Sequence, residues 1–190
     1  MKKLSYKFFE RNTIFVAKEL LGKYLVLKTP QGKLAGKIVE TEAYHENDPA
    51  SHSYRGMTPR NKPMFGPPGF AYVYFTYGMH YCFNVVTEPN GKAGAVLIRA
   101  VEPIEGIALM KKNRRKKDLK ILTNGPAKLA QAFGIDKKFN GVDLVKSNLN
   151  IYSDGKSNHQ IKKSKRIGIS VAEHALLRFY IKENKFVSVK

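Results

Sequence analysis

The stretch at positions 71–86, AYVYFTYGMHYCFNVV, is the feature that most restricts how this chain can fold. It is rich in aromatic and β-branched residues, which favour strands. The Tyr-Gly-Met interruption in its middle fits a tight turn, so the stretch predicts a β-hairpin. Tyr77 would then lie at the hairpin tip, where polar residues normally sit and a large aromatic side chain is difficult to bury. A tyrosine at this place calls for a functional explanation.

The rest of the chain alternates predicted strands and helices. Strands are predicted at 23–29, 33–44, 93–100, 149–153, 165–170, 177–181 and 185–189. A first helix is predicted at 13–21, because Asn12 or Thr13 can cap its first turn and Gly22 follows its end. A second is predicted from Pro103 onward, with Ile107 and Met110 on its buried face. A third is predicted at 126–133, between Gly125 and Gly134.

Two segments lack a regular pattern. Residues 45–70 hold prolines and glycines without a period, and so long a loop in a compact domain is usually functional or disordered. Its apolar and basic residues favour function. Residues 156–165 are expected to be a mobile basic loop. No repeat or linker divides the chain, so residues 1–190 are predicted to form a single α+β domain: a curved, mostly antiparallel sheet with packed helices and a protruding β-hairpin.

The charge balance narrows the class of partner. The chain has 34 Lys+Arg against 15 Asp+Glu among 190 residues, a formal net charge of +19. A domain this basic repels itself unless a polyanion neutralises it, so nucleic acid is the leading partner class and an anionic membrane surface the second. Cys82 is the only cysteine, which excludes an intrachain disulfide and zinc sites built from several cysteines. No signal-like or membrane-spanning run is apparent, and a cytoplasmic, nucleoid-associated protein is expected.

Carboxylates on the predicted strand 33–44 are the first candidates for catalysis. If the strand is regular, Ile38, Glu40, Glu42 and Tyr44 share one face. Both glutamates could simply be solvated and paired with lysines. Alternatively, a carboxylate beside an aromatic residue at the entrance to a long loop can be a general base.

A metal site is a further alternative on the loop that follows this strand. His45, Asp48 and His52 could supply the ligands, although their spacing fits no helical or strand pattern.

The hairpin offers two faces. Tyr72, Tyr74 and Thr76 would share one, and Val73, Phe75 and Tyr77 the other. Val73 and Phe75 suit a core, whereas aromatic residues of a basic protein can also stack on nucleobases. A tyrosine at the tip could enter a DNA groove as a wedge.

Several basic residues are candidates for contacts with anions. Arg55 and Arg60 lie in or beside TPRNKP, and Lys128 lies in the first turn of the predicted helix 126–133. Arg99 ends an apolar strand on the same face as Ala95 and Leu97. Either Glu42 or a phosphate could be its partner.

Taken in order, these motifs resemble one family. VETEAY, PASHSYRG, TPRN, MF-x-x-PG, YVY-x-x-YGM-x-x-C-x-N, LIRAVEPIEG, GPAKL and LRFYI…VSV follow the order found in the alkyladenine (3-methyladenine) DNA glycosylases. The match covers nearly the whole chain. The resemblance implies a monofunctional enzyme that flips alkylated or deaminated purines out of duplex DNA and hydrolyses the N-glycosidic bond with water. It also implies no organic cofactor, no catalytic metal, no membrane partner and a monomer.

Residue roles follow from the same resemblance. Glu42 matches the glutamate that activates water, and Arg99 the arginine that helps to hold that water and a nearby phosphate. The other matches are Tyr44, His52 and Tyr74 around the flipped base, Asn84 as the residue that excludes normal guanine, and Tyr77 as the residue that fills the gap left by the flipped nucleotide. Met79, at the same hairpin tip, is also expected to intercalate, and the basic residues Arg55, Arg60 and Lys128 are expected to contact the DNA backbone. Shorter spacing between Tyr44 and His52, and longer spacing between Asn84 and Arg99, leave the preferred lesion open. A non-catalytic basic nucleic-acid-binding module is the alternative function.

Overall fold

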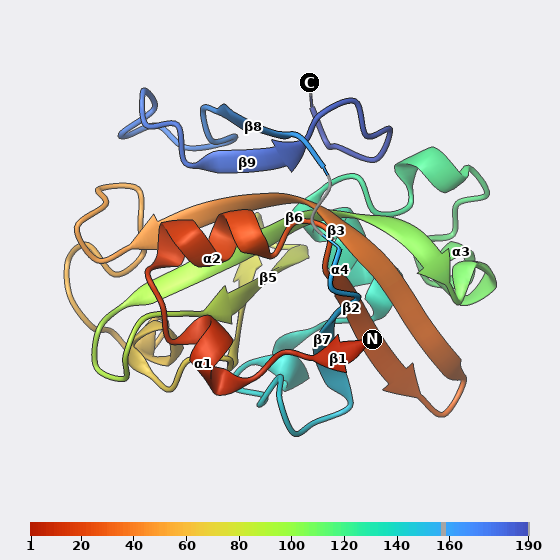
Figure 1. Ribbon diagram of the computed structural model, residues 1–190, viewed down its shortest axis with the longest axis horizontal. Coiled ribbons are helices and arrows are strands. Elements are labelled where there is room, and N and C mark those ends of the chain that lie inside the picture. Colours follow the sequence, from red (N-terminus) through yellow and green to blue (C-terminus); the bar gives the residue numbers. More distant parts are fainter. Residues whose placement is uncertain (157–158, 190) are drawn as a thin grey trace.

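One long strand, β3 (Gly32–His45), organises the sheet in the computed structural model, which describes residues 1–156 and 159–189. Its first half pairs with β2, the three residues Glu40 to Glu42 pair with β9, and most of its length pairs with β6. All strand pairs are antiparallel, and the main path runs β1-β7-β2-β3-β6-β5-β4, with β8 attached through β9 (Figure 1). This arrangement confirms the predicted α+β class with a mostly antiparallel sheet.

The other elements are short. The strands are β1 (Lys2–Lys3), β2 (Tyr24–Thr29), β4 (Ala71–Thr76), β5 (His80–Val86), β6 (Gly94–Glu105), β7 (Leu149–Ser153), β8 (Ile161–Ser164) and β9 (Arg178–Ile181). The helices are α1 (Tyr6–Phe9), α2 (Thr13–Glu19), α3 (Ile107–Arg114) and α4 (Pro126–Phe133), with 3₁₀ turns at Lys62–Phe65, Leu119–Ile121 and Lys137–Phe139. None of the helices in the described ranges is long and apolar enough to cross a membrane.

The main hydrophobic core lies between the sheet and the helices that pack on it. The Asn12 side chain caps α2 by accepting from the backbone N–H groups of Ile14 and Phe15, as its sequence predicts. α2 packs on β3 and β6, and α4 packs on β5 and β6 (Figure 1). Strand residues such as Val85, Val96 and Ile98 share this core with buried residues of both helices. The alternate residues of the same strands face away from it, and this second face carries the site described below.

Two bulges in the β3–β6 ladder adjust which side chains share a face. The pairing runs from Ile38↔Val101 to Glu40↔Ala100, which leaves Val39 extra on β3, and then to Thr41↔Ile98, which leaves Arg99 extra on β6. A bulge re-aims side chains, so the regular strand that the sequence predicts is wrong at this point. Ile38 joins the main core instead of sharing a face with the glutamates.

Other predictions about the elements need correction. Pro103 does not open a helix; it lies inside β6, opposite Gly36 at a register shift where a missing N–H is tolerated, and α3 begins four residues later. Strand β8 occupies part of the segment expected to be a loop, and its edge is protected by lysines. Positions 157 and 158 of that expected loop lie outside the described residues. Residues 165–170 and 185–189 form turns and irregular structure, not strands.

Gly106 connects β6 to α3 at a point where the backbone passes close to β3, and this close packing can be tested. Its φ of +76° is left-handed, and a Cβ there would collide with the backbone carbonyl of Lys33. Gly141 has a similar φ of +80° but nothing within 4 Å of the same position. We expect Gly141→Ala to cost about 1–2 kcal/mol from backbone strain alone and Gly106→Ala a further ~1–3 kcal/mol from overpacking. Urea unfolding measures both, and equal losses would contradict the close packing at Gly106.

Candidate active site

The second face of the sheet forms the floor of a cavity of about 550 Å³. Its walls come from five separate parts of the chain: β3, the loop after it, the β4–β5 hairpin, β6, and residues 167–171, with the start of α4 at the rim. The lining residues used below are Glu42, Tyr44, His52, Tyr72, Tyr74, Tyr77, Cys82, Asn84, Arg99 and Ile167. Ala95, Leu97 and Arg99 all line it, which confirms the alternation predicted for β6.

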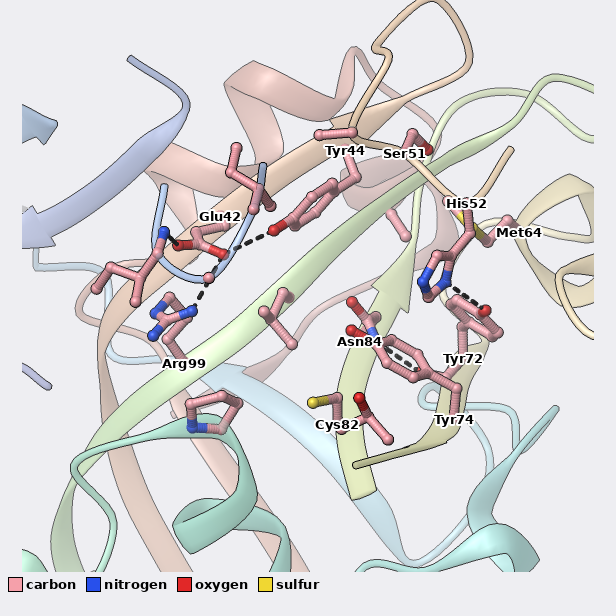
Figure 2. Close-up of a pocket in the computed structure, with 18 of the residues that line it drawn as sticks. Glu42, Tyr44, Ser51, His52, Met64, Tyr72, Tyr74, Cys82, Asn84 and Arg99 are labelled. Atoms are coloured by element: carbon pink, nitrogen blue, oxygen red, sulfur yellow. Dashed lines mark hydrogen bonds and ion pairs between the residues drawn. The ribbon is translucent and has the colours of Figure 1, made fainter. Parts of the chain in front are cut away.

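Glu42 is a fully buried carboxylate at one side of this cavity. Its Oε2 accepts a hydrogen bond from the Tyr44 hydroxyl at 2.9 Å and pairs with Nη1 of Arg99 at 3.2 Å. Its Oε1 accepts from the backbone N–H of Ile167 at 2.9 Å. Figure 2 shows the Tyr44 and Arg99 side chains converging on this carboxylate. Donors on both oxygens fix the orientation of the carboxylate.

Glu40, two residues earlier, is equally buried but does not line the cavity. Its Oε1 accepts from Nε of Arg99 at 3.1 Å, from Nε of Arg178 at 2.6 Å and from the Ser188 hydroxyl at 2.8 Å, while the Ser188 N–H donates to Oε2 at 2.7 Å. Both oxygens of Glu40 are therefore occupied by donors from the protein, and we assign this carboxylate a structural role. The interpretation of both glutamates as solvated partners of lysines is wrong, because both are buried against arginines.

Arg99 joins the two glutamates through different nitrogens of one guanidinium group. Burial alone would lower the pKa of Arg99, but the charges of Glu42 and Glu40 outweigh it and raise the pKa above its usual value. Of the two partners that the sequence left open for Arg99, Glu42 is the one in contact, and Glu40 is an additional one.

The opposite wall is aromatic. The rings of His52 and Tyr74 meet edge to face with centroids 4.6 Å apart, and a hydrogen bond of 2.9 Å joins Nδ1 of His52 to the Tyr72 hydroxyl (Figure 2). Burial, and secondly the positive charge of Arg60, lower the pKa of His52, so the neutral imidazole is favoured at pH 7. Burial raises the pKa of Tyr72 to about 12 and also raises that of Tyr74, so both phenols stay protonated.

Two residues complete the inner surface of the cavity. Asn84 is buried on β5, and its Nδ2 donates to the Tyr72 carbonyl at 3.0 Å, which fixes the amide orientation. Cys82 is also buried, and burial raises the pKa of its thiol, so the unreactive protonated form is favoured.

The hairpin tip behaves differently from its base. Tyr77 is 80% exposed and Met79 is 69% exposed, although Tyr77 also contributes to the cavity mouth. Tyr77 has a φ of +51°, an uncommon conformation for a residue other than glycine. The prediction for one face of β4 is confirmed, because Tyr72, Tyr74 and Thr76 line the cavity, and Val73 joins the core as expected. The core role predicted for Phe75 is wrong: near the hairpin tip its side chain is 49% exposed, and its ring lies beside that of Tyr81. Tyr77 reaches the cavity mouth instead of sharing a face with Val73.

The predicted backbone-binding residues lie outside the cavity. Arg55 is exposed, and Arg60 is exposed with its guanidinium group 5.6 Å from the centre of the Tyr74 ring. Lys128 is half-buried and donates to Oδ1 of Asn124 at 2.9 Å. Their roles toward DNA remain predictions.

The alternative of a metal site is not supported. Asp48 is buried and its carboxylate is paired with Arg166 through two nitrogens. Within the ranges 1–156 and 159–189, no group of three or more His, Cys, Asp and Glu residues is placed to hold a metal ion.

Sequence reasoning missed the contribution of residues 166–171. This segment is not a strand but supplies the Ile167 N–H to Glu42 and several residues of the cavity wall. Arg178, inside a predicted strand, was not recognised as a partner of Glu40. The glycine in KRIGIS was the one available sign of irregular structure, and it did not indicate where the segment would lie.

Comparison with known proteins agrees with the resemblance. The family model described as methylpurine-DNA glycosylase matches residues 7–185. A protein of Carboxydothermus hydrogenoformans, named "Putative 3-methyladenine DNA glycosylase", is 53% identical over 189 residues, which cover 98% of this chain and 99% of that protein. Proteins with the same name are 48% identical in Desulfitobacterium hafniense, over the full length of both chains, and 50% identical in Chlorobium phaeobacteroides, over 100% of this chain and 97% of that protein.

The different surroundings of the two glutamates predict different effects on stability. Glu40→Gln removes the charge that compensates Arg178 and turns an amide NH₂ toward other donors, so we expect a loss of about 3–5 kcal/mol. Glu42→Gln leaves Arg99 paired with Glu40, and a smaller loss of about 1–3 kcal/mol is expected. Urea unfolding at neutral pH compares the two variants. A larger loss of unfolding free energy for Glu42→Gln than for Glu40→Gln would contradict the structural role assigned to Glu40.

Proposed function

This chain belongs to the methylpurine-DNA glycosylase family, and from that premise we propose that it removes alkylated or deaminated purines from duplex DNA, flipping the nucleotide into the cavity and hydrolysing its N-glycosidic bond. The observation that carries the proposal is the buried Glu42 carboxylate, oriented by Arg99, Tyr44 and Ile167 at the edge of an aromatic cavity. The whole chain would act as one glycosylase domain and as a monomer.

Glu42 is the proposed general base. A water molecule beside its carboxylate would be oriented and deprotonated as it attacks the anomeric carbon, and this help is typically worth 10²–10⁴-fold. The negative charge would also stabilise the oxocarbenium-like sugar of the transition state. Arg99 would hold the carboxylate in place and help to position the water and a nearby phosphate, since its side chain reaches the same cavity.

The aromatic walls are the proposed binding site for the damaged base. Tyr44, His52 and Tyr74 line the space in which a flipped purine would stack. Many alkylated purines are cationic, and electron-rich rings attract a cation over their faces. The lowered pKa of His52 suits this role, because a neutral imidazole does not repel a positively charged base.

Selection and DNA distortion are assigned to other residues. The fixed amide of Asn84 would crowd the exocyclic amino group of normal guanine, so that selection works partly by exclusion. Tyr77, with Met79, would fill the gap that the flipped nucleotide leaves, and the exposure of both side chains supports this role. Arg55, Arg60 and Lys128 are proposed to contact the DNA backbone.

We further propose that the enzyme is monofunctional and leaves an abasic site. Among the described residues that line the cavity there is no lysine, which supports hydrolysis by water over a Schiff-base route. A non-catalytic nucleic-acid-binding module would account for the charge of +19 but not for a buried, oriented carboxylate in an aromatic cavity.

The first prediction for function concerns Glu42. We expect Glu42→Gln to reduce purine release from methylated DNA by about 10²–10⁴-fold, because the general base is lost, while lesion-duplex binding stays largely intact. The matched control is Glu46→Gln, which changes a carboxylate outside the cavity and should retain release. Single-turnover release and a binding titration measure both effects. Release by Glu42→Gln at the wild-type rate would disprove the mechanism, and a binding module would show no release with any variant.

The second concerns the hairpin tip. We expect Tyr77→Ala to weaken binding to lesion-containing duplex by about 10–100-fold, because one stacking contact is worth about 1–3 kcal/mol. Binding to single strands should change little, since no gap in a duplex has to be filled. Tyr54→Ala is the control, because Tyr54 is exposed but does not line the cavity. Equal weakening on duplex and single strands would remove the intercalation role.

A further inference from the structure

Arg166 is the most deeply buried arginine near the cavity that the mechanism above does not use. Its side chain is fully inaccessible to solvent, and it is not part of the cavity lining. Nη1 donates to the Ala43 carbonyl at 3.0 Å and to Oδ2 of Asp48, and Nη2 donates to Oδ1 of Asp48 at 2.8 Å. This bidentate fork is the arrangement that fixes a guanidinium group most firmly.

The same guanidinium group lies over Tyr44. Its central carbon is 4.7 Å from the ring centre, within the range of a cation–π contact. Because Arg166 lies outside the cavity and Tyr44 lines it, the arginine supports the ring from a side that the cavity does not use. Tyr44 in turn donates to the Glu42 carboxylate.

The residue after Arg166 completes the link. The Ile167 N–H is the donor to Oε1 of Glu42, and Ile167 begins the segment 167–171 that walls the cavity. In the described part of the chain, no backbone group of residues 166–171 makes a backbone–backbone hydrogen bond. Gly168, with a φ of +76°, adds local freedom. The position of this segment therefore depends on the Arg166 side chain and on the Ile167 hydrogen bond.

We infer that Arg166 is a positioning residue for the glycosylase reaction. Its ion pair with Asp48 holds residues 166–171 against the end of β3, so that the Ile167 N–H and the Tyr44 hydroxyl orient the two oxygens of Glu42. Arg166 touches neither base nor sugar in this assignment and acts only through Glu42 and Tyr44. The inference rests on the proposed function of Glu42, but it names a different residue and a different kind of contribution.

The test separates positioning from folding with two variants. Arg166→Met removes the fork and leaves Asp48 buried without its partner, which can unfold the protein. The double variant Asp48→Asn/Arg166→Met replaces both charges by neutral groups, a change that often preserves stability. Arg11→Met is the matched control, because Arg11 also pairs with a carboxylate and lies 4.6 Å from an aromatic ring centre, but outside the cavity.

We expect the folded Arg166 variants to release purine on the order of 10–100-fold more slowly in single turnovers, because small misplacements of a catalytic group have effects of this size. For Arg166→Met, lesion-duplex affinity should change less than about threefold relative to Arg11→Met, which loses the same charge. The double variant keeps the net charge of the wild type, so its affinity is compared with the wild type, and the same limit is expected. Glu42 keeps its contacts with Arg99 and Tyr44 in these variants, whereas the Ile167 N–H loses its support.

The outcomes distinguish the two proposals. If wild-type protein releases purine and the folded double variant does so at the same rate, Arg166 has only a structural role and the inference is overturned. If the wild-type protein releases no damaged purine in the same assay, the proposed function fails, and this inference fails with it. Slower release with unchanged affinity supports the inference.

Discussion

The buried cluster of Glu40, Glu42, Arg99 and Arg178 is the interaction on which the rest of the structure depends. Two carboxylates and two guanidinium groups lie beside one another with almost no access to water. Each charge would be very unfavourable alone in this position, so every member needs at least one partner of opposite charge. It joins β3, β6 and β9 and brings Ser188, near the end of the chain, against the centre of the sheet.

Within that cluster, the two glutamate side chains have different surroundings. Glu40 accepts four hydrogen bonds and is closed off, whereas Glu42 borders the cavity and is proposed to act on water. The difference comes from their other partners: Arg178 and Ser188 close off Glu40, whereas Tyr44 and the Ile167 N–H contact Glu42. Arg99, the extra residue of the bulge on β6, contacts both carboxylates. In a regular ladder Arg99 would itself pair with a residue of β3, whereas here it lies unpaired between Ala100, which pairs with Glu40, and Ile98, which pairs with Thr41.

The cavity combines a rigid inner part with an exposed tip. Its floor consists of sheet residues such as Asn84 on β5 and Leu97 on β6, and each of these strands is paired on both sides. The hairpin tip with Tyr77 extends beyond this support and is largely exposed. This division suits the proposed reaction, in which the base pocket has to keep its shape while the tip meets a duplex that changes its structure.

Much of the fold could be predicted from local patterns. The hairpin, α2 with its Asn12 cap, α4 between two glycines and the face of β6 that carries Arg99 all follow from alternation, caps and turns, which depend on near neighbours in sequence. The prediction of a helix from Pro103 is wrong, because a register shift in β6 accommodates the proline within the strand. The strand predicted at 165–170 is wrong, and in its place Arg166 pairs with Asp48 and the Ile167 N–H donates to Glu42.

The sequence by itself determined the class of fold, the basic charge and, through the order of its motifs, the resemblance to a DNA glycosylase family. It also supplied the candidates Glu42, Arg99, Tyr44, His52, Tyr74 and Asn84, all of which line one cavity. Only the tertiary structure decided that Glu42 borders the cavity while Glu40 does not, although both are buried. It also decided that Arg166 contacts the Ala43 carbonyl and that the Ile167 N–H contacts Glu42, across more than 100 residues of sequence. The physical reason is that burial and charge pairing are properties of groups brought together by the sheet, and no local pattern records which distant groups will meet.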